Sequence, residues 1–245
     1  MTSGLAQYDF GDVRLSLEVG EDVFKPTSTS RFLIENAAIR QGSSVLDMGC
    51  GVGPVAIMAA KKGAGRVYAV DIMERACDLA VRNMAHNGVS DRVTVLQGDL
   101  FEPVKDMQFD AIIDDVSGMA EEPSRISGWY PAPVPTGGMD GTEPTLRMLR
   151  EAPKHLTEGG VLYFPLLSLA NAGKLLSYAT EVFGSSIQQV FSRMIPFCKE
   201  LQQDIKRLDD MRRKGLIDYV SRGSRSLWHL RIFKATAYET GRFRT

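Results

Sequence analysis

The segment Val45-Leu46-Asp47-Met48-Gly49-Cys50-Gly51-Val52-Gly53-Pro54 decides the fold of this chain. Its first residues read as a short buried strand, and the glycines that follow break that strand into a tight turn. Pro54 suits the first position of a helix, because its missing N–H would have no partner there. A strand, a glycine turn and a helix start together indicate an open α/β sheet that binds a nucleotide-like ligand at this edge.

The spacing of the glycines distinguishes two classes of cofactor. Nicotinamide and flavin folds use G-x-G-x-x-G, which places a pyrophosphate at the helix start. Here Gly49, Gly51 and Gly53 stand at every second position, and Asp47 precedes them. This D-x-G-x-G-x-G arrangement resembles motif I of the class I S-adenosylmethionine (SAM) methyltransferases. The resemblance implies SAM as cofactor, bound by Asp47, Gly49, Cys50, Gly51 and Gly53; an ordinary βα turn is the structural alternative.

The length and composition of the chain limit the class of protein that it can be. A chain of 245 residues with a formal net charge of −1 fits one α/β domain and has no overall field that would attract nucleic acid. No apolar run reaches the ~18 residues of a membrane span, and the N-terminus lacks a signal-peptide pattern. Cys50, Cys77 and Cys198 form neither a disulfide framework nor a zinc pattern. We therefore expect a cytoplasmic protein without a metal site or membrane contact, while its oligomeric state stays open.

Two further acids follow predicted strands at positions that suit a nucleoside. Asp71 ends the strand over residues 66–71, roughly 20 residues after the glycines, where such folds place the carboxylate that accepts ribose hydroxyls; Ile72 follows it into the site. Asp99 is placed to accept the adenine amine, with the Leu100 N–H facing a ring nitrogen. The alternatives are a helix N-cap for Asp71 and a solvated turn acid for Asp99.

The rest of the pattern predicts a Rossmann-like fold. We expect seven strands, mostly parallel with an antiparallel last strand, and helices on both faces. Residues 1–40 form an N-terminal strand or hairpin and a helix that covers the site. Residues 41–245 form the cofactor-binding domain, with an inserted charged helix at about 196–215. Residues 119–145, rich in Pro, Gly and Ser, are the least regular part.

The predicted strand over residues 109–113 ends in the acids Asp114 and Asp115, in the crevice where such folds bind substrates. Methyl transfer from a sulfonium needs alignment and, for some acceptors, removal of a proton. Asp115 is the main candidate for orienting or deprotonating the acceptor, and Asp114 could hold a neighbouring group, unless it points into the sheet. Trp129, Tyr130 and Phe197 are candidate substrate-wall aromatics, with simple packing as the alternative.

More narrowly, the chain resembles the small-domain branch that contains release-factor glutamine and ribosomal RNA guanine methyltransferases. That branch has V-x-x-P-x-x-x-T before motif I, and Val23, Pro26 and Ser30 match it. The resemblance implies that Pro26 and Ser30 cover the methionine end of SAM, although Thr29 or Ser30 could simply cap a helix. Residues 137–141 and 156–160 match the branch's later G-G-x-D-G and L-x-x-G-G patterns.

The chain departs from this branch at one place that bears on the substrate. Where the branch has Asn-Pro-Pro-Tyr, this chain has Asp115-Val116-Ser117-Gly118. Glutamine or guanine as the acceptor therefore does not carry over from the resemblance. The paired acids favour instead an amine, a guanidine-like group or a hydroxyl on a small molecule.

Three alternatives to a small-molecule methyltransferase stay open. An RNA or protein methyltransferase would gain support if the basic, aromatic tail formed one patch: Arg222, Arg225, Trp228, Arg231, Arg242 and Arg244. Aminopropyl or amino-carboxypropyl transfer would use the same fold with different chemistry at Asp114 and Asp115. The last alternative is a non-catalytic SAM-binding protein.

Overall fold

The computed structural model describes residues 4–237. Its main sheet has the strand order β5-β4-β3-β6-β7-β10-β8, and β9 pairs with β10 at one end. The strands β3, β4, β5, β6 and β7 are parallel, and β10 runs antiparallel between β7 and β8. Their bounds are β3 Ser44–Met48, β4 Arg66–Asp71, β5 Val93–Gln97, β6 Phe109–Asp114, β7 Leu156–Leu167, β8 Gln188–Pro196, β9 Val220–Arg222 and β10 Arg225–Thr236. The expected Rossmann-like fold with an antiparallel last strand is confirmed, and the sheet has eight strands where seven were expected, because the short β9 also pairs with β10.

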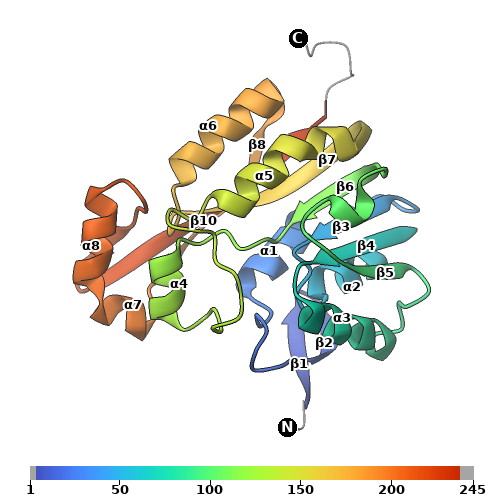
Figure 1. The fold of residues 1–245 in the computed structure, drawn as a ribbon, viewed down its shortest axis with the longest axis horizontal. Helices are drawn as coiled ribbons and strands as arrows, with labels where there is room; N and C mark the ends of the chain where they lie inside the picture. Colours follow the sequence, from blue (N-terminus) through green and yellow to red (C-terminus); the bar gives the residue numbers. More distant parts are fainter. Residues whose placement is uncertain (1–3, 238–245) are drawn as a thin grey trace.

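Helices cover both faces of this sheet (Figure 1). The helices on one face are α1 Ser28–Asn36, α2 Pro54–Lys61 and α3 Glu74–His86, and those on the other are α5 Glu143–Glu151 and α6 Ala172–Phe183. Short 3₁₀ turns complete the chain at Glu102–Val104, Ala152–His155 and Gly184–Ser186. Each face has its own buried apolar cluster, and within a strand alternate residues enter opposite clusters.

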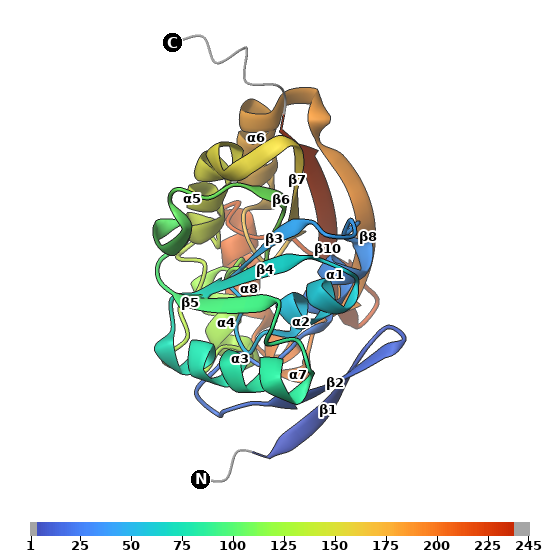
Figure 2. The same cartoon turned by 90° about the vertical axis from the view of Figure 1, so that its right-hand side faces the viewer.

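The N-terminal residues form a hairpin apart from the main sheet. β1 Leu5–Phe10 pairs with β2 Val13–Glu18, so of the two expectations for the N-terminal residues, a strand or a hairpin, the structure has the hairpin. Figure 2 shows this hairpin below the sheet, beside α3. Asn83 of α3 and Asn87, which caps the end of α3, hold it: Asn83 bonds to the N–H and C=O of Glu18, and Asn87 bonds to those of Ser16.

Two parts of the chain differ from the sequence-based expectation. The irregular stretch 119–145 contains a helix, α4 Glu121–Ser127, which ends at Gly128 in a left-handed conformation. The charged helix expected at about 196–215 is broken at Asp204 into α7 Lys199–Gln203 and α8 Ile205–Arg213. In Figure 1, α4, α7 and α8 gather at one end of β10. No helix within residues 4–237 is long and apolar enough to cross a membrane.

Candidate functional site

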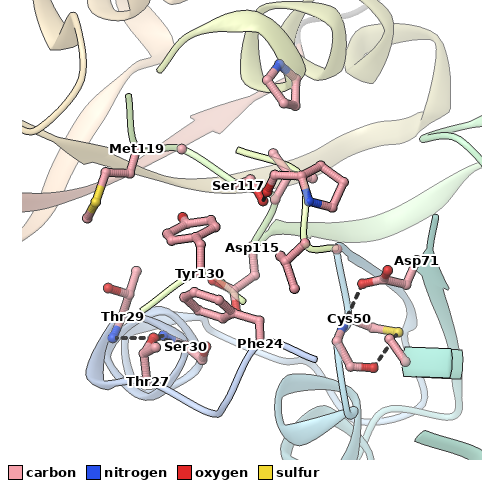
Figure 3. A pocket seen from close by; sticks show the side chains of 18 of the residues that line it. Phe24, Thr27, Thr29, Ser30, Cys50, Asp71, Asp115, Ser117, Met119 and Tyr130 are labelled. Carbon is pink, nitrogen blue, oxygen red and sulfur yellow. Dashed lines mark hydrogen bonds between the residues drawn. The ribbon is translucent and has the colours of Figure 1, made fainter. Parts of the chain in front are cut away.

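A cavity of about 790 Å³ opens at the carboxyl ends of β3, β4 and β6. Its walls come from the start of α1, the glycine loop after β3, the exits of β4, β5 and β6, the loop 128–136 and the start of β10. Figure 3 shows the side chains that line it, with Asp71 and Cys50 on one side and Phe24, Ser30 and Tyr130 on the other. The structure therefore has a cavity where the strand ends predicted a crevice.

The loop after β3 requires glycine at two positions, Gly49 and Gly51, for two different reasons. Gly49 has φ +79°, and a Cβ on it would lie 2.8 Å from the backbone of Val116, so the loop packs directly on the exit of β6. Gly51 has φ +52°, and a Cβ there would meet no protein atom within 4 Å, so its surroundings are open for a ligand. Gly53, which precedes α2, does not line the cavity.

Asp71 lines the cavity and is held by the glycine loop. One carboxylate oxygen accepts the Gly51 N–H at 2.8 Å, and the other accepts the Met73 N–H at 2.9 Å. Burial raises the pKa of this carboxyl, and the two N–H groups oppose that rise. Met73, and not Asp71, is the N-cap residue of α3. Ile72, 52% exposed, lines the cavity next to it.

Leu100, just after β5, has an unusual backbone conformation. Among residues 4–237, Leu100 alone of the non-glycine residues has a positive φ angle, at +50°. Such a conformation costs energy and persists where the surroundings fix it, often at binding sites. Its neighbour Asp99 also lines the cavity, and Asp99 Oδ2 accepts Nη2 of Arg147 at 2.7 Å. No sequence pattern pointed to Arg147, which belongs to α5 and stands 48 residues after Asp99.

Asp47 is buried away from the cavity, whereas Cys50 lines it. Asp47 is fully buried and does not line the cavity; its Oδ2 accepts the Ala56 N–H at 2.9 Å and so ties β3 to α2. Burial raises its pKa well above the usual range, and the charge of Asp115 adds to that rise. Cys50 lines the cavity but is 3% exposed, and burial likewise raises the pKa of its thiol.

The start of α1 reaches the cavity with Pro26 and Ser30. The helix cap is Thr27, whose hydroxyl oxygen accepts the N–H groups of Thr29 and Ser30. The expected alternative, a cap at Thr29 or Ser30, is therefore wrong. The Ser30 side chain has no capping role and is 5% exposed.

The two strand-end acids face different ways because side chains alternate along a strand. The Asp114 side chain lies on the same face of β6 as that of Ile112, is 0% exposed and does not line the cavity. Its Oδ1 accepts the Val116 N–H at 3.2 Å, and its Oδ2 has no hydrogen-bond partner in residues 4–237. Burial raises its pKa well above the usual range. The expectation that Asp114 holds part of the substrate is not supported by this placement.

Asp115 faces the cavity, and its N–H donates to Met48 O at 2.8 Å. Burial raises its pKa to about 7, the charge of Asp71 adds to the rise, and a hydrogen bond from the Ser30 hydroxyl opposes it. In Figure 3 the carboxyl lies beside the rings of Phe24 and Tyr130. A carboxylate in such a place can accept an N–H and can take up a proton near neutral pH.

Aromatic side chains line the cavity beyond Asp115. The rings of Phe24 and Tyr130 are 4.7 Å apart between centroids, and those of Trp129 and Trp228 are 6.2 Å apart. Tyr130 and Trp129 lie where the sequence predicted, whereas Trp228 was assigned to a basic tail. Phe197 packs on Tyr219, with centroids 5.0 Å apart, and is not part of the cavity lining.

Arg125 on α4 shapes this aromatic wall. Its guanidinium donates to three carbonyl oxygens of the loop 128–136, those of Tyr130, Pro131 and Val134, at 3.5, 3.2 and 3.3 Å. The loop contains three prolines, which lack N–H donors, so its backbone can pair little with itself. Side chains therefore hold the loop in place, and the Arg125 guanidinium is the charged group that does so.

These groups fit S-adenosylmethionine. The open space at Gly51 admits a ligand against the loop, the Asp71 carboxylate offers two oxygens to a vicinal diol, and the Asp99–Leu100 exit faces the same cavity. The cavity continues past Asp115 to the aromatic wall, which leaves room for a second molecule next to the cofactor.

Comparison with known proteins gives consistent relatives. Residues 24–115 match the family model described as methyltransferase small domain. A ribosomal protein uL3 glutamine methyltransferase of Bradyrhizobium diazoefficiens is 41% identical over 124 residues, which are 48% of this chain and 39% of that protein. A putative protein N5-glutamine methyltransferase of Methanocaldococcus jannaschii is 32% identical over 175 residues, 69% of this chain and 87% of that protein. This chain therefore spans less than half of the first relative and most of the second.

A solved structure shares the fold. The Thermus thermophilus 16S rRNA N2 G1207 methyltransferase, in complex with AdoMet and guanosine, has a TM-score of 0.60 and 16% sequence identity, covering 95% of this chain and 50% of that one. At that identity the likeness concerns the fold alone.

Proposed function

Because this chain belongs to the methyltransferase small-domain family of SAM-dependent methyltransferases, we propose that it methylates a nitrogen atom of a protein side chain. The names of the relatives support a macromolecular acceptor, since they refer to glutamine in ribosomal protein uL3 and to protein glutamine. The expectation of a small-molecule acceptor finds no support among them. The earlier alternative, a protein or RNA acceptor, is the better supported one.

The observation that carries this proposal is the position of Asp115. Its carboxylate faces the cavity between the cofactor side, marked by Asp71 and the glycine loop, and the aromatic wall. An ionised carboxylate only accepts hydrogen bonds, so the acceptor group beside it must bring an N–H or O–H. The rings of Phe24 and Tyr130 contact each other, with centroids 4.7 Å apart, and form an apolar wall beside Asp115 on which the stem of a side chain can pack.

In this mechanism the chain contributes binding, alignment and a proton acceptor. Bound SAM supplies an electrophilic methyl group on a sulfonium. The glycine loop, Asp71 and the Asp99–Leu100 exit would hold it at one end of the cavity. Asp115 accepts an N–H of the acceptor, turns the nitrogen lone pair toward the methyl group, and takes up the proton that the nitrogen loses.

The arginines of the predicted basic tail lie away from the cavity. Along β10, side chains alternate, so Trp228 faces the cavity while Arg225 and Arg231 point to the other face. The Arg231 guanidinium lies over the ring of Phe233, at 5.6 Å. Arg225 pairs with Arg222 across the β9–β10 turn, so Trp228 is the described member of the predicted tail that lies on the opposite face from Arg225 and Arg231, and Arg242 and Arg244 lie outside the described residues.

Transfer of a labelled methyl group tests the proposal. The protein is incubated with methyl-tritiated SAM and an extract of its source cells, and the products are treated with protease, with ribonuclease, or passed through a small-pore filter. We expect label in protease-sensitive material. Asp115→Asn should retain SAM binding and lose transfer, whereas Asp106→Asn, which changes an exposed acid that does not line the cavity, should behave like the unaltered protein. Label only in RNA or in small molecules would refute a protein acceptor.

A further inference from the structure

The strand β8 is the last strand of the main sheet, and its outer edge pairs with no other strand of residues 4–237. Figure 2 shows β8 at the edge of the sheet, with α1 beside it. Just past the ladder between β8 and β10, the Phe197 N–H donates to Ser226 O at 2.9 Å. Since hydrogen-bonded positions alternate along an antiparallel pair, the backbone of Arg193 faces β10, whereas the backbones of Met194 and Ser192 face outward. Outward N–H and C=O groups can pair with another extended chain.

Two arginines lie together on one face of this edge. Arg193 of β8 has its guanidinium over the ring of Phe32, at 5.1 Å from the ring centre, and Arg31 of α1 has its own at 4.8 Å. Phe32 stacks in turn on Phe191 of β8. Arg193 is exposed and has no ion pair within residues 4–237, and the Nε of Arg31 is 3.5 Å from Glu35 Oε1. Arg31 and Arg193, the arginine pair, therefore form a local positive charge that suits carboxylates.

The edge and the arginine pair lead to the end of the cavity that has the aromatic wall. Ile195 lies two residues after Arg193 on the same face of β8, is opposite Trp228 on β10, and lines the cavity with it. On α1, Ser30 lines the cavity, and Arg31 is the next residue. A chain that adds to β8 beside the arginine pair therefore passes directly to the cavity.

We propose that the outer edge of β8 and the arginine pair bind an extended acidic segment of the protein acceptor, which adds to the sheet as a further strand and brings the residue to be methylated to the cavity. This inference rests on the proposed function and names the surface that selects the protein. Backbone hydrogen bonds to β8 supply binding that is independent of sequence. Carboxylates opposite the arginine pair supply the selectivity.

Two other occupants fit this surface less well. A second copy of the chain, paired antiparallel through β8 about its middle residue Ser192, would bring the two Arg193 side chains close together, and like charges repel. RNA has no ladder of N–H and C=O groups to match a strand edge. Its bases would need an open ring to stack on, and Phe32 is only 5% exposed. An acidic peptide matches both the edge and the arginine pair.

The first test reverses the charge of one arginine. Arg193→Glu should raise the KM for the labelled protein fraction about three- to tenfold, because an attractive surface contact becomes a repulsive one, and the effect should shrink at high salt. The matched control is Arg66→Glu. Arg66 is also exposed on a strand and has no ion pair in the described part of the chain, but it lies at the amino end of β4. The control should change KM by less than twofold, and both variants should bind SAM as the unaltered protein does.

The second test uses a peptide and needs no methyl transfer. A peptide of about ten residues that alternates Glu and Thr is long enough to span β8. With this peptide at millimolar concentration, amide hydrogen exchange in residues 190–196, followed by mass spectrometry, should slow at least about threefold. The same peptide with Lys in place of Glu, and oligouridylate RNA, should leave the exchange unchanged. Arg193→Glu should remove the protection, and Arg66→Glu should retain it.

The outcomes separate this inference from the proposed function. If the unaltered protein labels no protein, the proposed function fails, and the exchange experiment still tests the edge of β8. If protein is labelled but Arg193→Glu leaves KM within twofold, the docking surface is refuted. It is refuted as well if the acidic peptide gives no protection, or if the lysine peptide or the RNA protects β8 equally. Protection without peptide that grows with protein concentration would also refute it and would mark the edge as an interface between two copies.

Discussion

Replacing Asp115 by asparagine should stabilise the protein, and increasingly so as the pH rises from 5 to 8. The side chain faces the cavity from a largely apolar setting, and burial raises its pKa from 3.8 to about 7. A carboxyl whose pKa is raised by folding favours the folded state at low pH, and that advantage disappears as the pH rises through the folded-state pKa. Asparagine does not titrate, so the variant avoids this loss.

The size of the effect follows from the shift. A rise of about 3 pKa units corresponds to about 4 kcal/mol, which is an upper limit because solvent in the cavity screens the charge. Part of this difference is already present at pH 5, where the unfolded carboxyl is ionised. Between pH 5 and pH 8 we therefore expect the advantage of Asp115→Asn to grow by about 2 kcal/mol, or roughly 4–8 °C in Tm for a chain of this length.

Thermal unfolding followed by circular dichroism at pH 5, 6, 7 and 8 measures this directly. Asp106→Asn serves as the control, since Asp106 is exposed, and its Tm difference from the unaltered protein should stay flat with pH. A Tm difference for Asp115→Asn that does not change with pH, or a variant that is less stable at pH 8, would show that the carboxyl is not held in the environment described above. The expected stabilisation together with loss of methyl transfer would mark Asp115 as a functional group kept at the expense of stability.

Three further substitutions test the supports of the site. Gly49→Ala should destabilise the protein by more than about 2 kcal/mol in urea unfolding, because its Cβ would collide with the Val116 backbone, whereas Gly128→Ala, at φ +68° in open space, should cost only about 1 kcal/mol; equal costs would contradict the packing of the glycine loop. Asn83→Ala removes three hydrogen bonds of a fully buried side chain to Glu18 and Val52, and should cost about 2–4 kcal/mol; a loss below about 1 kcal/mol would mean that the hairpin is held by other contacts. Arg125→Met should speed amide hydrogen exchange in residues 128–136 by about tenfold or more while exchange in the glycine loop is unchanged, and equal exchange in both proteins would show that the loop holds its shape without the guanidinium.

The glycine-loop side of the cavity could be predicted from the sequence because the residues that form it are close together along the chain. The glycine spacing after Asp47 and the acid at Asp71 follow from how a strand turns into a helix, and the structure brings Gly51 and Asp71 together at 2.8 Å. Asp99 and Leu100 line the same cavity for the same reason. Each of these residues lies within three residues of the end of a strand.

The acceptor side depends on contacts that are distant along the chain. Strand alternation distinguishes Asp114 from Asp115, but only once the end of β6 is fixed at Asp114. Trp228 reaches the cavity because β10 returns antiparallel between β7 and β8, a pairing that the sequence pattern does not specify. Phe197 misses the cavity because it packs on Tyr219, beyond the inserted helices. Arg125 and Arg147 act through helices whose positions are set by tertiary packing.

The central claim is that the glycine loop and Asp71 bind SAM, and calorimetric titration of the purified protein with SAM tests it most directly. The account predicts saturable binding at one site, lost in Asp71→Ala and in Gly51→Val, whose side chain would fill the open space at the loop. Binding should persist in Asp115→Asn, which leaves that loop unchanged. Absence of binding to the unaltered protein, or equal affinity in Asp71→Ala, would contradict the account.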